Sequence, residues 1–108
     1  EVAARAGARI VLDEASVPVR QQVRAVCDLL GLDPLYVACE GRALLWVAAS
    51  DAERCVDALR AHPQGAGAAV IGRVAAAEAG RAPVALCTAY GTERPLDVLS
   101  GSELPRIC

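Results

Sequence analysis

Short apolar segments alternate with turn-forming residues along the whole chain, and the longest of them covers only residues 43–49. A helix that spans a bilayer needs roughly 20 apolar residues, so we expect no membrane segment. The chain has 108 residues, 55% of them apolar and 22% charged, which favours one folded domain over disorder. Phe and Met are absent and Trp46 is the only Trp, so small aliphatic side chains must form the core.

The charge of the chain argues against a nucleic-acid partner. The net charge is −2, and the basic residues, all of them Arg, form no cluster along the sequence. Proteins that bind nucleic acid need a basic face to neutralise phosphates. We therefore expect neither a nucleic acid nor a membrane as partner.

Two segments have the apolar spacing of amphipathic helices. The first is expected to begin at a Ser16 cap, to tolerate Pro18 in its first turn and to end at Gly31. The second is expected to begin at Ser50, where Glu53 three residues later predicts a capping box. The two apolar stripes consist of Val19, Val23, Val26, Cys27 and Leu30, and of Ala52, Cys55, Val56 and Leu59.

Apolar, β-prone runs predict six strands, at residues 8–12, 35–38, 44–48, 69–74, 82–89 and 95–99. The polar residues 39–42 between the second and third runs predict the turn of a hairpin. The first six elements have the order β-α-β-β-α-β, which is typical of the ferredoxin-like fold. We therefore expect an α+β domain over residues 1–99, with an added β-hairpin after these six elements. Residues 100–108 lack periodicity and are expected to form a flexible C-terminal tail.

Five cysteines occur without a C-x-x-C spacing, which argues against a disulfide framework and against a metal site. Cys27, Cys55 and Cys87 lie in predicted helices or strands and are expected to be small core residues. Cys39 comes just before the predicted turn. Cys108 ends a polar tail, beside a terminal carboxylate that disfavours the thiolate. Such a thiol suits a group carrier, which holds a chemical group while the active sites of other domains or proteins act on it.

Residues 96–108, which end in Pro-Arg-Ile-Cys, resemble the C-terminus of the hydrogenase expression/formation protein family HypE. The resemblance extends back through residues 35–41, 62–63 and 68–72, so it covers essentially the whole chain. HypE resembles aminoimidazole ribonucleotide synthetase, with an ATP-binding N-terminal domain and an α+β C-terminal domain. The resemblance implies that ATP and magnesium bind in an N-terminal domain outside this chain. Residues 65–67 are not a phosphate loop, because no Lys or Ser/Thr follows at the required spacing.

The resemblance also implies a chemistry for Cys108. A partner carbamoyltransferase places a carboxamide on its thiol, and ATP-dependent dehydration converts this group to a thiocyanate. The cyano group then passes to iron on a scaffold complex and becomes a cyanide ligand of NiFe hydrogenase. Dehydration removes two N–H protons and therefore requires a general base. The family has a Glu in an Asn-Glu-Gly turn, which implies that Glu40 is this base and that Cys39 replaces the Asn.

The same resemblance implies a cytoplasmic protein that is a homodimer at full length, with no cofactor or metal held by this chain. The chain alone is expected to be catalytically inactive. Two other function classes stay open: a non-catalytic ligand-binding or dimerisation module of the same superfamily, and a thiol metal chaperone that uses Cys39 and Cys108. Transfer of one carboxamide to Cys108 would separate the first reading from both alternatives.

Overall fold

The computed structural model describes residues 1–98, which divide into two units. The first unit consists of Glu1–Pro18 and Ala48–Val98, and the described part of the second is Val19–Val47. The sheet belongs to the first unit. The expected tail, residues 100–108, and with it Cys108, lies outside the described residues.

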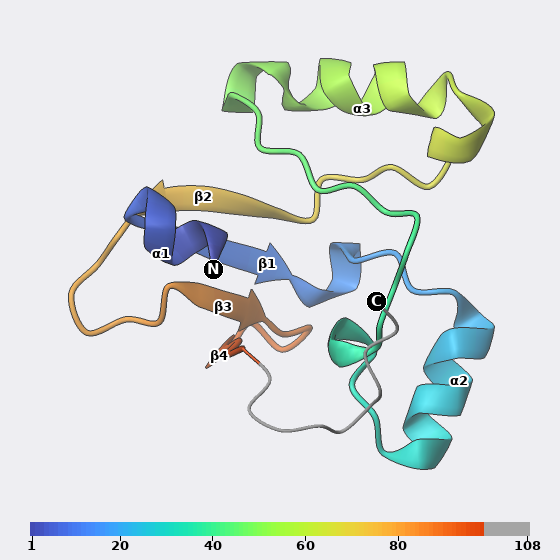
Figure 1. Cartoon of the computed structure of the whole chain (residues 1–108), viewed down its shortest axis with the longest axis horizontal. Coiled ribbons are helices and arrows are strands. Elements are labelled where there is room, and N and C mark those ends of the chain that lie inside the picture. Colours follow the sequence, from blue (N-terminus) through green and yellow to red (C-terminus); the bar gives the residue numbers. More distant parts are fainter. Residues whose placement is uncertain (99–108) are drawn as a thin grey trace. The chain divides into compact units, whose positions relative to one another are not determined.

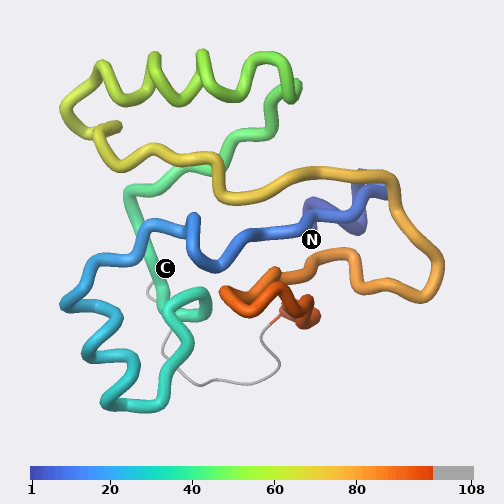
Figure 2. Tube along the Cα trace, turned by 180° about the vertical axis from the view of Figure 1, so that it is seen from behind, coloured from blue at the N-terminus to red at the C-terminus, as the bar shows by residue number. Residues whose placement is uncertain are grey.

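The first unit is built on a four-stranded sheet with the order β2-β1-β3-β4 (Figures 1 and 2). The strands are β1 (Ala8–Asp13), β2 (Gly72–Ala76), β3 (Val84–Cys87) and β4 (Glu93–Pro95). The central β1 pairs antiparallel with β2 and parallel with β3, and β3 pairs antiparallel with β4. The sheet therefore pairs β1, near the start of the chain, with strands whose partner residues lie 60 or more positions away in sequence.

The core of this unit lies where β1 and β3 adjoin. Val11 and Leu86 are 1% and 0% exposed, and the buried Ala85 lies opposite Val11 in the parallel register. On the other side of β1, the β2 backbone approaches so closely that a Cβ on Gly72 would overlap the Val11 carbonyl oxygen. Gly72 is thus required for the start of β2 to pair with β1.

Two helices belong to the first unit. The short α1 (Val2–Ala6) buries Ala3 and ends at Gly7, whose φ of 58° is left-handed. The second, α3 (Ala52–Arg60), follows a 3-10 turn at Ala49–Asp51. The predicted capping box at Ser50 is wrong, because the N-cap residue is Asp51 and its side chain makes no capping hydrogen bond. The predicted apolar stripe is confirmed as the less exposed face of α3, namely Ala52, Cys55, Val56 and Leu59.

The helix of the second unit, α2 (Gln21–Leu30), ends at Gly31 as predicted. Gly31 has a φ of 68° and donates its N–H to the Cys27 carbonyl oxygen. The predicted apolar stripe is only partly confirmed, because Cys27 is 3% exposed whereas Val23 and Val26 are 41% and 54% exposed. The helix therefore keeps most of its apolar face uncovered among the described residues.

The start of α2 differs from the prediction. Ser16 does not cap it; this residue lies in a 3-10 turn at Glu14–Ser16, and its hydroxyl hydrogen-bonds to the Asp13 carboxylate. The residue before a proline is disfavoured in the helical region, and Val17, which precedes Pro18, is extended. The helix can begin only after this extended stretch.

The predicted hairpin over residues 35–48 is wrong for this structure. Pro34–Tyr36 forms a 3-10 turn, and the Asp33 carboxylate caps it by accepting the Leu35 N–H at 2.9 Å. Residues 37–48 have no helix or strand. The α+β class is confirmed, but the ferredoxin-like order is only partly reproduced, because two of its strands are missing among residues 1–98.

Candidate functional site

The turn at residues 39–41 is the part of the predicted site that the structure describes. Its backbone bends at Gly41, whose φ of 72° is in the left-handed region. Cys39 and Glu40 are both exposed, and within residues 1–98 no hydrogen bond or ion pair holds the Glu40 carboxylate. This carboxylate is therefore free to accept a proton from a group brought to it. Cys108 lies outside the described residues, so its position relative to Glu40 stays a prediction.

The four described thiols differ in accessibility. Cys27 is buried as predicted, whereas Cys55 and Cys87 are half-buried and Cys39 is exposed. The Cys87 sulfur lies 3.9 Å from the Thr88 carbonyl oxygen. Cys39 is thus the most accessible thiol of the described part of the chain.

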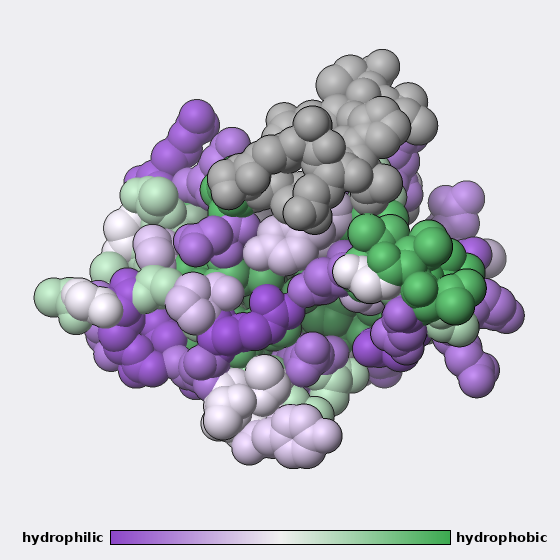
Figure 3. Space-filling model, turned by 90° about the horizontal axis from the view of Figure 1, so that it is seen from below, coloured by the Kyte–Doolittle hydropathy of each residue, from purple (hydrophilic) through white to green (hydrophobic). Residues whose placement is uncertain are grey.

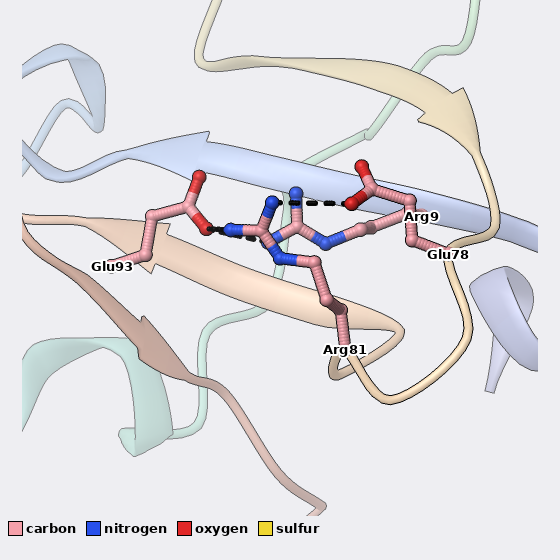
Figure 4. A network of polar contacts seen from close by, with 4 residues as sticks. All are labelled: Arg9, Glu78, Arg81 and Glu93. Carbon is pink, nitrogen blue, oxygen red and sulfur yellow. Dashed lines mark hydrogen bonds and ion pairs between the residues drawn. The ribbon is translucent and has the colours of Figure 1, made fainter.

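A network of ion pairs, absent from the sequence predictions, lies across the sheet (Figure 4). Arg9 of β1 and Arg81 both donate from Nη2 to Oε2 of Glu93, at 2.6 and 2.5 Å. Arg81 also donates to Glu78 at 3.2 Å. The sequence signal for this network is an Arg at an inward position of an apolar strand, flanked by Ala8 and Ile10.

Arg9 is the buried member of this network, and the ion pairs of the network shift the pKa values of two other members. The Arg9 side chain is 6% exposed, against 27% for Glu93 and 47% for Arg81. The hydrogen bond from Arg9 is the main cause that lowers the pKa of Glu93, and the charges of Arg81 and Arg73 act in the same direction. Hydrogen bonding to Glu78 and the charge of Glu93 raise the pKa of Arg81. Both pKa shifts favour the ionised forms of Glu93 and Arg81.

A hollow of about 210 Å³ lies beside this network, lined mainly by Ala, Gly and Pro residues of α1 and of residues 77–83. The charged groups that reach it, Arg9, Glu78 and Arg81, are paired within the network. Each of these charged groups has an ion-pair partner, although the buried Arg9 Nε has no hydrogen-bond partner among residues 1–98, and we assign the network a structural role.

Neither a metal centre nor a membrane span is found in the part of the chain that the structure describes. No three His, Cys, Asp or Glu side chains gather around a common point among residues 1–98. No helix in the same residues is long and apolar enough to cross a bilayer.

Comparison with known protein families identifies the chain. The family described as "AIR synthase related protein, C-terminal domain" matches residues 1–84. The chain belongs to this family. The match covers α1, α2, α3, β1 and β2, and it ends at Val84, the first residue of β3.

Individual relatives show to which proteins of this family the chain is similar. The chain is 50% identical over all of its 108 residues to a carbamoyl dehydratase HypE from Azotobacter vinelandii, of which it covers 31%. It is 46% identical to a carbamoyl dehydratase HypE from Rhodobacter capsulatus, again over the whole chain and 31% of the relative. The chain thus spans about a third of the length of these relatives, and the resemblance to HypE expected from the Pro-Arg-Ile-Cys terminus is confirmed.

Solved structures agree with this assignment. A crystal structure of the hydrogenase maturation protein HypE matches with a TM-score of 0.89 at 42% identity, over 99% of this chain and 35% of that one. A crystal structure of the hydrogenase maturation protein HypE in complex with ATP matches with a TM-score of 0.88 at 41% identity, over 99% of this chain and 32% of that one. A HypE–HypF complex matches with a TM-score of 0.80 at 30% identity, over 89% and 30%. The fold described above is therefore that of the corresponding third of HypE.

Proposed function

We propose that this chain is the C-terminal part of a carbamoyl dehydratase that acts in the maturation of NiFe hydrogenase. The observation that supports this most is the identity of 46–50% to HypE relatives over an alignment that covers the whole chain. Because the chain spans only a third of those relatives, the activity belongs to the full-length protein.

In the proposed reaction, the Cys108 sulfur holds the one-carbon group throughout. The sulfur first accepts a carboxamide, which replaces the thiol proton. ATP then phosphorylates the amide oxygen, the C–O bond breaks with phosphate as leaving group, and two N–H protons depart to leave a thiocyanate. The net change is the removal of one water molecule, with ATP converted to ADP and phosphate, so no oxidant or reductant is needed.

We assign the two proton transfers to Glu40. The side chain is exposed on a turn, and no partner within residues 1–98 competes for its carboxylate. A carboxylate with no ion pair is a suitable acceptor for protons that become acidic once the amide oxygen is phosphorylated. Cys39 in place of the family Asn leaves Glu40 without a neighbouring amide donor, so its orientation depends on other residues of the site.

We place the nucleotide in the part of the full-length protein that is outside this chain. A HypE structure in complex with ATP supports the use of ATP. Residues 1–98 do not fit a magnesium site, because no cluster of carboxylates occurs among them. No step of the reaction is therefore routed through a metal on this chain.

The partners of the proposed reaction are a carbamoyltransferase, which loads Cys108, and an iron-bearing scaffold complex, which accepts the cyano group. The HypE–HypF complex supports a protein partner for this type of chain. A full-length homodimer and a cytoplasmic location are part of the same proposal.

The deciding experiment uses the full-length protein with carbamoyltransferase, carbamoyl phosphate and ATP. Mass spectrometry of the C-terminal peptide should detect first the gain of one carboxamide on Cys108 and then the loss of one water. A Cys108→Ser variant should show neither change at this peptide. Absence of any gain on the wild-type peptide would favour the non-catalytic binding or dimerisation module, whereas stoichiometric retention of metal would favour the chaperone.

A further inference from the structure

Asp33 organises the turn that leads from α2 towards Glu40. Its carboxylate accepts the N–H of Leu35 at 2.9 Å, and its carbonyl oxygen accepts the N–H of Tyr36 at 3.0 Å. Pro34 occupies the first position of this 3-10 turn, where its fixed φ suits the helical conformation. The side chain and the backbone of one residue therefore hold both N–H groups of the turn in place.

Hydrogen bonds also join this turn to the end of α2. Gly31 ends the helix with a left-handed φ of 68°, and the N–H of Leu32 donates to the Cys27 carbonyl oxygen at 2.8 Å. Cys27 is buried, but Leu30 is 63% exposed, and hydrophobic side chains gather at the surface where α2 lies (Figures 1 and 3). Among the described residues, hydrogen bonds therefore fix the exit from the helix more than burial does.

Glu40 follows this turn at a short distance along the chain. Val37, which comes directly after the turn, is extended and half-buried, whereas residues 38–40 are exposed. Glu40 thus lies three residues beyond Val37, which is at most about 10 Å in a fully extended chain. On the N-terminal side of Glu40, the turn capped by Asp33 is therefore the nearest part of the chain that hydrogen bonds hold in place.

We propose that Asp33 is a positioning residue for Glu40. By capping the turn, Asp33 sets the direction in which the backbone approaches Glu40 and thereby the orientation of the Glu40 carboxylate. This role rests on the proposed function of Glu40 as the base, and Asp33 acts through the turn without contact to the reacting group. A base must lie within hydrogen-bond reach of the proton that it accepts, so a displacement of about 1 Å slows the transfer strongly. Cys39 offers no side-chain amide that could orient Glu40 in place of this turn.

Single variants of the full-length protein test this role. Asp33→Ala removes the capping carboxylate, so single-turnover dehydration of the loaded carboxamide should slow at least about tenfold. Loading of Cys108 should keep its wild-type rate, because loading needs no base at this turn. Asp33→Asn retains a side-chain oxygen that caps equally well, and should dehydrate within about threefold of the wild type. Dehydration at the wild-type rate in Asp33→Ala would overturn the proposal.

The matched control is Asp28→Ala, which removes an exposed carboxylate from α2 in the same unit. It should load and dehydrate as the wild type does, and a slowing equal to that of Asp33→Ala would contradict a specific role for the cap. If Asp33→Ala does not fold, Asp33→Glu replaces it, because the longer side chain keeps the charge but displaces the capping oxygens.

A double variant separates positioning from a general structural role. If Asp33 acts through Glu40, the Glu40→Gln background leaves no base to position. Asp33→Ala with Glu40→Gln should then dehydrate as slowly as Glu40→Gln alone. A further slowing by the factor seen for Asp33→Ala alone would overturn the proposal, since Asp33 would act independently of Glu40.

The same series distinguishes the failure of this inference from the failure of the proposed base. If Glu40→Gln alone dehydrates at the wild-type rate, the assignment of the base is wrong and the role of Asp33 fails with it. If Glu40→Gln is slow but Asp33→Ala is not, Glu40 keeps its role and only the positioning by Asp33 is refuted.

Discussion

Arg9 of β1 donates a hydrogen bond of 2.6 Å to Glu93 of β4, although β3 lies between these two strands and 84 residues separate the pair in sequence. The contact crosses the sheet and is shared with Arg81. Because Arg9 is the buried partner, the pair fixes the position of β4 at the edge of the sheet more firmly than three residues of pairing alone would.

Removal of the Glu93 carboxylate should destabilise the first unit. Glu93→Ala leaves the Arg9 guanidinium buried without its acceptor. We expect a clear fall in the free energy of unfolding, smaller than the full cost of a broken buried pair because Glu93 is partly exposed. Urea unfolding of the full-length protein measures it. Glu78→Ala, which removes only an exposed partner of Arg81, is the control and should cost less than about 0.5 kcal/mol. Equal losses of stability in the two variants would mean that the burial of Arg9 does not increase the cost of removing its partner.

The same pair predicts a dependence of stability on pH. The pKa of Glu93 is lowered in the folded state from the ordinary value of 4.5, chiefly by the hydrogen bond from Arg9. The ionised form is thus favoured by folding, and its contribution is complete above pH 4.5 and is lost as the pH falls through the folded-state pKa. The difference in melting temperature between the wild type and Glu93→Gln should be constant from pH 5 to 7 and shrink below pH 4.5. A difference that grows on acidification would contradict this sign.

Local sequence signals predicted the parts of the fold that depend on nearby residues. Gly31 ends α2, and β1 and β3 occupy the β-prone runs, because each outcome depends on backbone preference and apolar content in a short window. The start of α2 was wrong because two local rules competed there. The effect of Pro18 on the preceding residue outweighed the capping tendency of Ser16.

Features set by distant residues were not predicted. β2 begins at Gly72 rather than at residue 69, because its start depends on the close approach to Val11 in β1. β4 ends at Pro95 instead of beginning there, because a turn closed by the Thr88 N–H and the Thr92 carbonyl oxygen sets its register. The Glu40 turn could be placed from the sequence, since Gly41 marks it. The distance from Glu40 to Cys108 could not be predicted, because no residue close to either of them in sequence determines it.

The thiols should react with alkylating reagents in an order set by burial. In the native full-length protein we expect Cys108 to react first, as a group carrier must be reachable. Cys39 should follow because it is exposed, and Cys55 and Cys87 should be slower because they are half-buried. Cys27 should react last. Time-resolved mass mapping with iodoacetamide gives this order, and modification of Cys27 before Cys39 would contradict the burial of Cys27.

Glu40→Gln should separate loading from dehydration. In the full-length protein, the variant should still accept the carboxamide on Cys108, because loading needs no base at this turn. Dehydration should slow by roughly 10²–10⁴-fold, which is typical for the loss of one positioned base. Single-turnover mass spectrometry of the loaded protein measures the rate. Glu53→Gln, which changes an exposed carboxylate on α3, is the matched control and should behave as the wild type. Dehydration at the normal rate in Glu40→Gln would assign the base to another residue.

An extension after Cys108 should impair the reaction at the carrier itself. A carrier thiol at a free chain end can enter a narrow site, whereas added residues must be accommodated beside the reacting sulfur. Residues 101–108 reach at most about 25 Å when extended, so the tail cannot loop far around such an obstacle. Wild-type full-length protein and a variant with several residues appended to Cys108 are incubated with the carbamoyltransferase and then with ATP, and the carbamoylated and dehydrated fractions are measured. The extended variant should fall short in one or both steps. Equal fractions in both steps would show that the free terminus is not required, and the function of Cys108 would then depend on its thiol alone.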